Sequence, residues 1–594
     1  MNGGTELCLS DPAISVCNRP VRTVRWQDTL LILLVAGLLL FVGLGRRGLW
    51  AAEGRWAEVT REMFLTGDFF HPTIGGEPYF DKPLLTYWFR AAFYAVTGTL
   101  NELIVRLPSA FAGLAAVWAT MWIGARLWSA QTGMIAACLL LTMYAFVFWA
   151  RTGTAEAENV AAIMLAVAWY WSRRDRPGFG AMLVFYLIAF VGALTKGLTA
   201  VVVPICIVLP DMVVERRWRN LLSIKHIGAL AIALLVYLAP FVYAGQTQPA
   251  GYHSSGLALV FRENVLRYFQ PFDHKGAFYL YLYALPILLL PWTPLFVLAA
   301  IGLVKCRKKL DSHTRWLMWA IAAVFLFFTL SGSRRSYYIL PILPLCALLM
   351  AVFVAWTRQD ELEEIRQRGL GIQKAVLAAL IVFDLAIPIV MTVAMKIWDF
   401  QVPLSFYLAS LVIGAIAALV GLALERFTWP RFAPEGQKTI LIQIAVAIVL
   451  IGGYFGWQQG ILDQNRTEYP FAKELQASSA SLAPERIAMF PKTNANLLFY
   501  LNADRPIPVL QDADQLRRFL ETGRPGVVIS QCRYVSQLPR DILNMLWSGQ
   551  HIREQTQPWE SRSSQQEKWV AWFWPRTTGT PQTTQTGESD DHAN

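Results

Sequence analysis

Charged residues that could do chemistry gather in a few short segments between long apolar stretches of this chain. The first segment reads Glu53-Gly-Arg-Trp-Ala-Glu-Val and is followed by Tyr79-Phe-Asp-Lys-Pro-Leu-Leu-Thr-Tyr-Trp. It supplies Glu53, Glu58, Asp81 and Lys82 beside predicted membrane spans, where charges need either solvent or a polar cavity. The segment is therefore either a solvated loop or the mouth of a substrate site.

A second acidic segment, Glu156 and Glu158, follows Arg151 and opens an apolar stretch. Carboxylates at a helix N-terminus are favoured by the helix dipole, so a simple first-turn preference is one interpretation. Two acids placed directly before an apolar stretch also indicate a polar cavity. Both interpretations stay open.

Basic residues occur at two further places where membrane orientation does not explain them. Lys196 lies in Leu-Thr-Lys-Gly-Leu, and no Gly-rich loop precedes it, which excludes a nucleotide-binding P-loop. A Lys that extends its ammonium group to the membrane surface is the alternative. Arg334 and Arg335 lie in Ser333-Arg-Arg-Ser-Tyr-Tyr, and Arg binds phosphate through two parallel hydrogen bonds. Together with Lys82, these residues predict an anion site.

His274, in Phe272-Asp-His-Lys-Gly-Ala-Phe-Tyr, is a candidate metal ligand. Paired with Asp81 it could hold a divalent metal. Two candidate ligands are a weak signal, so the alternatives are a zinc ion and no metal.

The elements that must position these residues are predicted to be membrane spans. The chain has 594 residues, of which 55% are hydrophobic, and a mean hydropathy of +0.39. A helical span needs about 20 apolar residues. Thirteen candidate spans recur along the chain, which predicts a polytopic α-helical membrane protein. They are residues 29–45, 103–125, 130–149, 158–173, 179–195, 198–213, 226–245, 279–303, 315–331, 337–356, 374–395, 405–424 and 439–457.

The net charge of +11 reflects membrane orientation and not nucleic-acid binding. Basic residues cluster in short loops that all fall on one side if the N-terminus is cytoplasmic. An odd number of spans then places the C-terminus outside. The first apolar stretch follows Arg19, Arg22 and Arg25 and resembles a signal peptide, but Arg46 and Arg47 follow at once without a small-residue cleavage site. We therefore expect an uncleaved first span.

The first outer loop contains a candidate amphipathic helix, Glu53–Phe64. Trp56, Val59, Met63 and Phe64 form one apolar stripe on it. Such a helix either lies in the membrane interface or packs on its own protein.

Residues 461–576 predict a small α/β domain outside the membrane, and the polar tail 577–594 is expected to be disordered. The predicted strands are Ile487–Phe490, Leu497–Leu501, Val527–Ser530 and Lys568–Trp574, and the predicted helices are Asp514–Glu521 and Arg540–Trp547. The seven cysteines show neither metal-ligand spacing nor a disulfide framework.

As an ordered set, these segments resemble the GT-C glycosyltransferases that use polyprenyl-phosphate sugars. The chain looks most like the bacterial aminoarabinose transferases of lipid A, with protein O-mannosyltransferases as more distant relatives. The resemblance covers about residues 28–460 and extends loosely into the outer domain. It rests on Glu53-Gly-Arg-Trp-Ala-Glu-Val, Phe80-Asp-Lys-Pro-Leu-Leu-Thr-Tyr-Trp, Leu194-Thr-Lys-Gly-Leu, Asp273-His-Lys-Gly-Ala-Phe-Tyr and Arg334-Arg-Ser-Tyr-Tyr-Ile-Leu-Pro.

This resemblance implies a 13-helix membrane domain within residues 1–460, a periplasmic α/β domain and an undecaprenyl-phosphate-linked donor. It also implies roles for particular residues. Asp81 and His274 match a metal pair of the family, and Glu156 matches the acidic residue of the second outer loop. Lys82, Lys196 and the Arg334–Tyr338 segment match positions near the carrier phosphate. The candidate substrate-binding residues are therefore Arg55, Lys82, Lys196, Arg334, Arg335, Tyr337 and Tyr338.

The chain departs from the family pattern at one position. The family usually has Asp-Glu where this chain has Ala52-Glu53, and that Asp is a leading candidate for the catalytic carboxylate. Glu53 and Glu156 are then the acids expected to orient the acceptor and stabilise positive charge on the sugar. A phosphate acceptor, as on lipid A, is already an anion, whereas a hydroxyl acceptor gains about 10²–10⁴-fold from a base.

The sequence thus predicts an inverting glycosyltransferase of the bacterial inner membrane with a periplasmic active site. It would transfer a sugar from an undecaprenyl-phosphate donor to lipid A or a related envelope lipid. The alternatives are transfer to protein or another glycan, and a non-catalytic carrier-binding or transport protein. A transporter should place polar groups in broken helices at mid-membrane, and Asp384 is one of few such residues, so the acids at the outer face favour the enzyme.

Overall fold

The computed structural model describes residues 24–574 except 51, 80–81, 248–256, 271–274, 356–359, 399–402, 427–434, 464–467, 536, 548 and 557–564. The chain forms two compact units. The first comprises Met1–Trp56, Phe80–Val393 and Val402–Gln464, and the second Ala57–Tyr79, Ala394–Gln401 and Asn465–Asn594. The second unit therefore includes part of the first outer loop, which the expected boundary at residue 460 did not anticipate. The expected tail, 577–594, lies outside the described residues.

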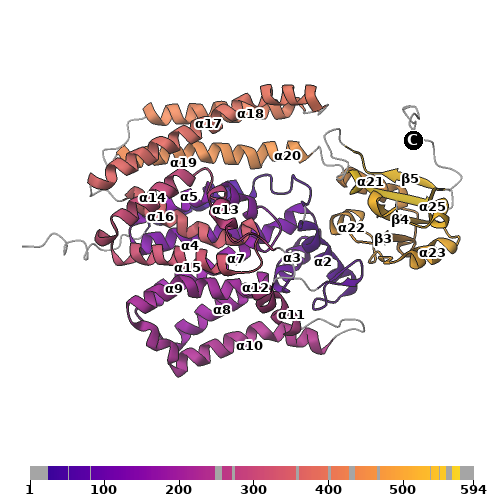
Figure 1. The fold of residues 1–594 in the computed structure, drawn as a ribbon, viewed down its shortest axis with the longest axis horizontal. Helices are drawn as coiled ribbons and strands as arrows, with labels where there is room; N and C mark the ends of the chain where they lie inside the picture. Colours follow the sequence, from indigo (N-terminus) through magenta and orange to yellow (C-terminus); the bar gives the residue numbers. More distant parts are fainter. Residues whose placement is uncertain are drawn as a thin grey trace, which may run out of the picture. The chain divides into compact units, whose positions relative to one another are not determined.

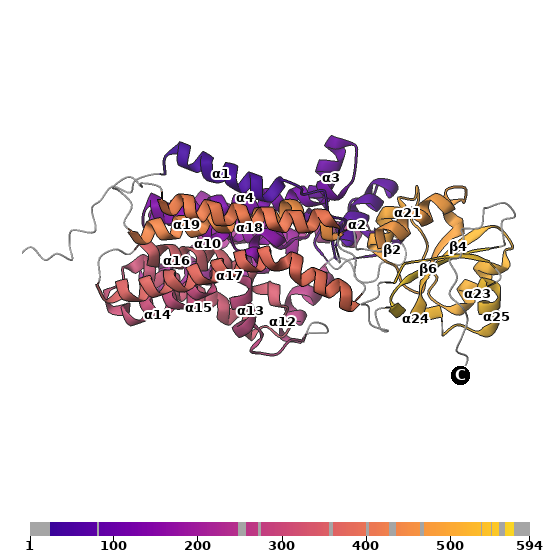
Figure 2. The same ribbon diagram turned by 90° about the horizontal axis from the view of Figure 1, so that it is seen from above.

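The first unit is helical, and most of its long helices run alongside one another (Figures 1 and 2). Eight helices in the described part of the chain are long and apolar enough to cross a membrane, or ten if each of two bent pairs counts as one span. The chain is thus a multi-pass membrane protein, as predicted. The eight are α4 (Glu102–Leu127), α8 (Phe179–Lys196), α10 (Ile224–Gln246), α15 (Ser312–Leu330), η5 with α16 (Ser336–Ala355), α17 (Asp360–Trp398), α18 (Leu404–Arg426) and α19 (Glu435–Gly453) with its extension.

Three other predicted spans form shorter or less apolar helices. α1 (Trp26–Phe41) and α9 (Thr199–Val214) are apolar but short, and α7 (Glu156–Arg173) carries the two acids in its first turn. α16 (Leu343–Ala355) is apolar on every face and almost wholly buried, and α4, α15, α5 (Ala130–Leu141) and α14 (Thr293–Lys305) pack around it. A helix that is hydrophobic all round belongs in such a core.

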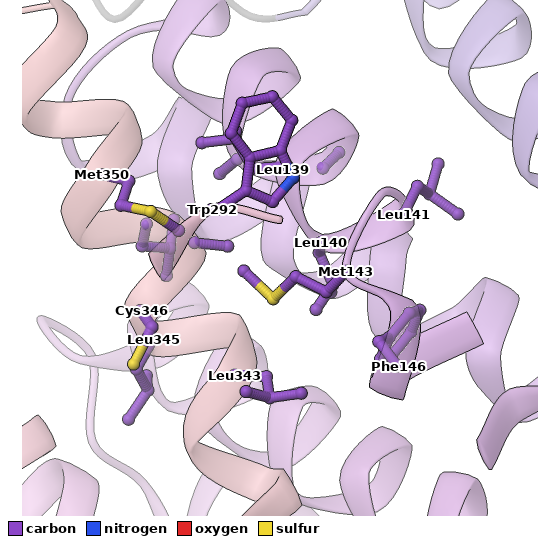
Figure 3. Close-up of a cluster of buried hydrophobic side chains, with 14 of the residues drawn as sticks. Leu139, Leu140, Leu141, Met143, Phe146, Trp292, Leu343, Leu345, Cys346 and Met350 are labelled. Atoms are coloured by element: carbon purple, nitrogen blue, oxygen red, sulfur yellow. The ribbon is translucent and has the colours of Figure 1, made fainter. Parts of the chain in front are cut away.

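Two predicted spans are broken helices whose breaks contact each other. α5 (Ala130–Leu141) and α6 (Tyr144–Ala150) are bent by 73°, and α13 (Leu280–Leu288) and α14 (Thr293–Lys305) by 115°. Backbone freed by a break within a membrane must find partners inside the protein. Tyr144 N donates to Leu290 O at 3.0 Å, and the Trp292 indole N–H donates to Thr142 Oγ1 at 2.9 Å. Figure 3 shows Trp292 among buried side chains that include Leu139, Met143 and Met350.

The second unit contains a four-stranded sheet in the order β3-β4-β6-β5, seen at the yellow end of the chain in Figure 1. The strands are β3 (Ile487–Phe490), β4 (Gly526–Gln531), β5 (Gln550–Arg553) and β6 (Trp569–Trp574). β3 and β4 are parallel, and β6 runs antiparallel to β4 and β5. α21 (Glu468–Ser479), α22 (Ala495–Leu501), α23 (Ala513–Glu521) and α25 (Arg540–Trp547) accompany the sheet. β3, β4, β6, α23 and α25 confirm predicted elements.

The prediction of a strand at Leu497–Leu501 is wrong, because these residues form α22. Asn494 caps the helix by accepting a hydrogen bond from Leu497 N, and Asn502 ends it in a left-handed conformation. A short apolar run bounded by Asn residues fits a buried strand and a buried helix equally well.

The remainder of the second unit comes from the first outer loop. The helix α2 (Glu53–Thr66) begins in the first unit and continues in the second, where the hairpin of β1 (Thr73–Ile74) and β2 (Glu77–Pro78) follows it. The Glu62 carboxylate accepts hydrogen bonds from Gly75 N at 2.6 Å and Thr73 Oγ1 at 2.5 Å, which fixes the hairpin to α2. The Arg61 guanidinium donates to Ala503 O, so this loop is joined to the sheet domain.

Burial decides between the two interpretations of α2. Trp56, Val59 and Met63 of its apolar stripe are buried, but so are Glu58 and Glu62. α2 therefore packs on its own protein along Trp56, Val59 and Met63, whereas Phe64 at the end of the same stripe is exposed.

Candidate functional site

Glu53 lies in the first turn of α2, at the centre of a network of buried charges. Arg106 of α4 donates to both carboxylate oxygens, with Nε–Oε1 at 2.7 Å and Nη2–Oε2 at 2.8 Å. Arg47 donates at 3.1 Å, Trp50 N at 2.7 Å and Gly153 N at 2.6 Å. Glu53 thereby ties together the end of the first span, α4 and the second outer loop.

This network determines the ionisation of Glu53. Burial alone would raise the pKa of its carboxyl, but the charges of Arg106 and Arg47 and the hydrogen bonds from Arg106 and Gly153 lower the pKa to about 2. A carboxylate whose two oxygens are engaged by several donors is a poor general base. The geometry therefore favours a positioning role for Glu53, and its expected catalytic role stays a prediction.

Two arginines that were not among the predicted site residues complete the charged network. Arg106 is buried in α4, and Arg90 of α3 (Leu85–Thr97) lies 3.3 Å from the Glu158 carboxylate. Ser109 also donates to Glu158 at 3.3 Å. The signal that could have revealed both arginines was a charged residue inside an apolar helix, which needs a buried partner.

Glu156 and Lys196, 40 positions apart in the sequence, form an ion pair. Lys196 Nζ at the end of α8 lies 3.2 Å from Glu156 Oε1 at the start of α7. The other carboxylate oxygen, Oε2, is buried and makes no hydrogen bond to the described residues, and the same holds for the nearby Thr154 hydroxyl. A buried carboxylate oxygen that lacks a donor within the protein can accept a hydrogen bond from a bound molecule.

The Lys196 ammonium also faces two aromatic rings from the predicted anion segment. Its Nζ lies 5.7 Å from the ring centroid of Tyr337 and 5.3 Å from that of Tyr338 in η5 (Ser336–Ile342). Arg335 donates to the Tyr337 hydroxyl at 3.2 Å, and the Trp149 ring lies 4.4 Å from the Tyr337 ring. The structure thus brings together four predicted site residues, Lys196, Arg335, Tyr337 and Tyr338, beside Glu156.

Arg334 has a different environment from its neighbour Arg335. Its guanidinium donates to Thr329 O at 2.9 Å and to Gly276 O at 2.8 Å. Lys275 and Ser333 form an isolated β-bridge beside it. Arg334 therefore joins the segment after His274 to the segment before η5, and the exposed Arg335 is better placed to bind an anion.

Comparison with known proteins identifies the family. Residues 81–243 match the family model for dolichyl-phosphate-mannose-protein mannosyltransferase. An undecaprenyl phosphate-alpha-4-amino-4-deoxy-L-arabinose arabinosyl transferase from Pseudomonas paraeruginosa is 31% identical over 448 residues, covering 71% of this chain and 76% of the relative. The chain belongs to this arabinosyl transferase family. The relative from Aeromonas salmonicida is 28% identical over 59% of this chain and 62% of its own length.

The fold agrees with that of a solved protein. The crystal structure of ArnT from Cupriavidus metallidurans bound to undecaprenyl phosphate matches with a TM-score of 0.68 and 20% identity, over 93% of this chain and 99% of that one. The likeness extends over nearly the whole of both chains, so this arabinosyl transferase family member shares the fold of that structure.

Of the remaining predicted site residues, Arg55 and Lys82 are described by the structure, and Arg55 is close enough to Tyr337 for their charges to interact. The Arg55 guanidinium lies 5.6 Å from the Trp56 ring centroid, and Lys82 is half-buried just before α3. Asp81 and His274, the expected metal ligands, lie outside the described residues, so the zinc site stays a prediction. Among the residues that the structure does describe, no cluster of three metal-binding side chains occurs.

Proposed function

We propose that this protein transfers a sugar of the 4-amino-4-deoxyarabinose class from undecaprenyl phosphate to lipid A or a related envelope lipid. The donor and the sugar come from the names of relatives that match over most of the chain. The observation that carries the proposal is the ion pair between Glu156 and Lys196. One oxygen of the Glu156 carboxylate makes no hydrogen bond to the described residues, and the pair lies beside Arg335 and two tyrosines.

In the proposed reaction, an acceptor oxygen attacks the anomeric carbon of the sugar. The new carbon–oxygen bond forms while the bond to the phosphate oxygen breaks, and the electron pair leaves on the phosphate. Cations held around that phosphate stabilise the charge that develops there, and Lys196 and Arg335 supply them. In either acceptor class the attacking oxygen reaches the anomeric carbon from the face opposite the leaving phosphate, which accounts for inversion.

Glu156 and Glu53 then have separate roles. Glu156 faces the sugar and stabilises its positive charge, and it accepts the proton if the acceptor is a hydroxyl group. A phosphate acceptor brings no such proton, so transfer to lipid A phosphate tolerates Ala52 in place of the family Asp. Glu53 positions the second outer loop through Gly153.

We also propose thirteen spans, with the site and the second unit on the periplasmic side of the inner membrane. Eight long helices, two bent pairs, α1, α7 and α9 together give this number. Impermeant maleimide applied to intact cells should label Thr522→Cys, at an exposed turn of the second unit, and should leave Lys308→Cys unlabelled. Labelling of both or of neither would overturn the orientation.

Mass spectrometry of lipid A and total glycolipids tests the function directly. Cells lacking the protein should lose a sugar-sized mass on lipid A phosphate, which returns with the wild-type protein and with Lys308→Met, an exposed control. Lys82→Ala and Lys196→Met should fail to restore it, because each removes a cation from the carrier phosphate. If a modification is lost from protein or from another glycan instead, the acceptor is not lipid A. If no glycan changes, the result favours a non-catalytic carrier-binding protein.

A further inference from the structure

Lys196 is shared between an acid and two aromatic rings, and this sharing points to a step that precedes transfer. Its ammonium contacts Glu156 Oε1 at 3.2 Å and lies over Tyr337 and Tyr338. The Lys196 side chain is 16% exposed, so a bound molecule can reach it. A cation–π contact leaves the ammonium hydrogens available to whichever anion is present.

The surroundings of Glu156 make Lys196 its balancing charge. The groups that face it are Lys196 from α8, Tyr337 from η5 and Thr154 from its own loop. Glu158, two positions further along α7, adds a like charge, and its own partner is Arg90 of α3. Removal of Lys196 from Glu156 would therefore leave a buried carboxylate without its cation.

We propose that Lys196 is exchanged between Glu156 and the carrier phosphate during each reaction cycle. This inference rests on the proposed function, because it needs a phosphate at Lys196. As the phosphate arrives and gains charge, its oxygens replace Glu156 Oε1 as partner of the ammonium, and Glu156 becomes available to the sugar or the acceptor. The exchange balances charge without any covalent change at Lys196.

The same exchange has a consequence for product release. The leaving carrier is a phosphate monoester, which holds about −1.5 to −2 charges near pH 7 and so binds an ammonium group strongly. Glu156 competes for that ammonium and re-forms the pair when the carrier leaves. Glu156 is thus predicted to weaken carrier binding, although it lies beside the carrier site.

Binding of undecaprenyl phosphate to the detergent-solubilised full chain tests the exchange. Glu156→Gln should bind the carrier at least about three-fold more tightly than wild type, because an ion pair that competes with binding is lost. Glu364→Gln is the control, since its carboxylate is exposed and pairs with Arg368, and its affinity for the carrier should stay within two-fold of wild type. Lys196→Met should bind the carrier at least ten-fold more weakly than wild type.

The outcomes separate this inference from the proposed function. Equal or weaker binding by Glu156→Gln, together with lost binding by Lys196→Met, would overturn the exchange and leave the phosphate site intact. Full binding by Lys196→Met, or no binding by wild type, would overturn the phosphate site and the exchange with it. Unfolding temperatures of the variants, measured in parallel, identify any variant that is misfolded, and Glu156→Ala then repeats the test with a different side chain.

Discussion

Replacing Arg106 by Met should destabilise the first unit strongly. Arg106 donates to both oxygens of Glu53 and to the carbonyl oxygens of Leu44, Arg47 and Gly48 at 2.7–2.9 Å. Met has a similar length but no donor, so the substitution leaves three buried carbonyl groups and part of a carboxylate without their donors. Removing one partner of a buried ion pair costs about 3–5 kcal/mol.

The assay is thermal unfolding of the purified protein in detergent, where we expect the midpoint to fall by roughly 5 °C. Arg106→Lys is the matched control, because Lys keeps the charge but cannot bond both carboxylate oxygens in the guanidinium geometry. Its midpoint should lie between those of wild type and Arg106→Met. An Arg106→Met midpoint within 1 °C of wild type would refute the view that the Glu53 network holds the outer loops in place.

Three other perturbations test separate parts of the structure. Burial raises the pKa of Glu58 from 4.5 to about 7, so its contribution to the stability of the fold is greatest below pH 4.5 and falls by about 3 kcal/mol as pH rises to 7. Glu58→Gln should flatten this part of the curve of unfolding midpoint against pH, and an unchanged slope would contradict the shift. Gly75→Ala should destabilise the second unit by at least 1 kcal/mol, measured by urea unfolding, because its φ is +65° and a Cβ would lie 2.9 Å from Ile507 O. Thr142→Val should cost about 1–3 kcal/mol in the same assay, since it leaves the buried Trp292 indole N–H without its acceptor, whereas Thr142→Ser should be nearly neutral.

The membrane helices were predictable because apolar length is a local property of the sequence. The same is true of β4 and α23. β4 is a short apolar segment that is buried, and α23 is an amphipathic segment that buries Leu516 and Leu520. α22 could not be predicted, since five consecutive apolar residues carry no periodicity that separates a helix from a strand.

The candidate site was only partly predictable, for a different reason. Residue types marked Lys196 and Glu156 as unusual, but their pairing depends on how α7 and α8 pack. The role of Glu53 was predicted from a family position, whereas its surroundings are decided by Arg106, 53 positions further along the chain. Long-range pairing between buried charges leaves no spacing pattern in the sequence.

The inclusion of Ala57–Tyr79 in the second unit has a consequence for biosynthesis. Asn465, where the last and longest segment of that unit begins, follows Tyr79 by 386 residues. At about 5–20 residues per second, a ribosome needs roughly 20–80 s to make the intervening chain. The early segment must therefore wait through insertion of nearly every span before its folding partners emerge.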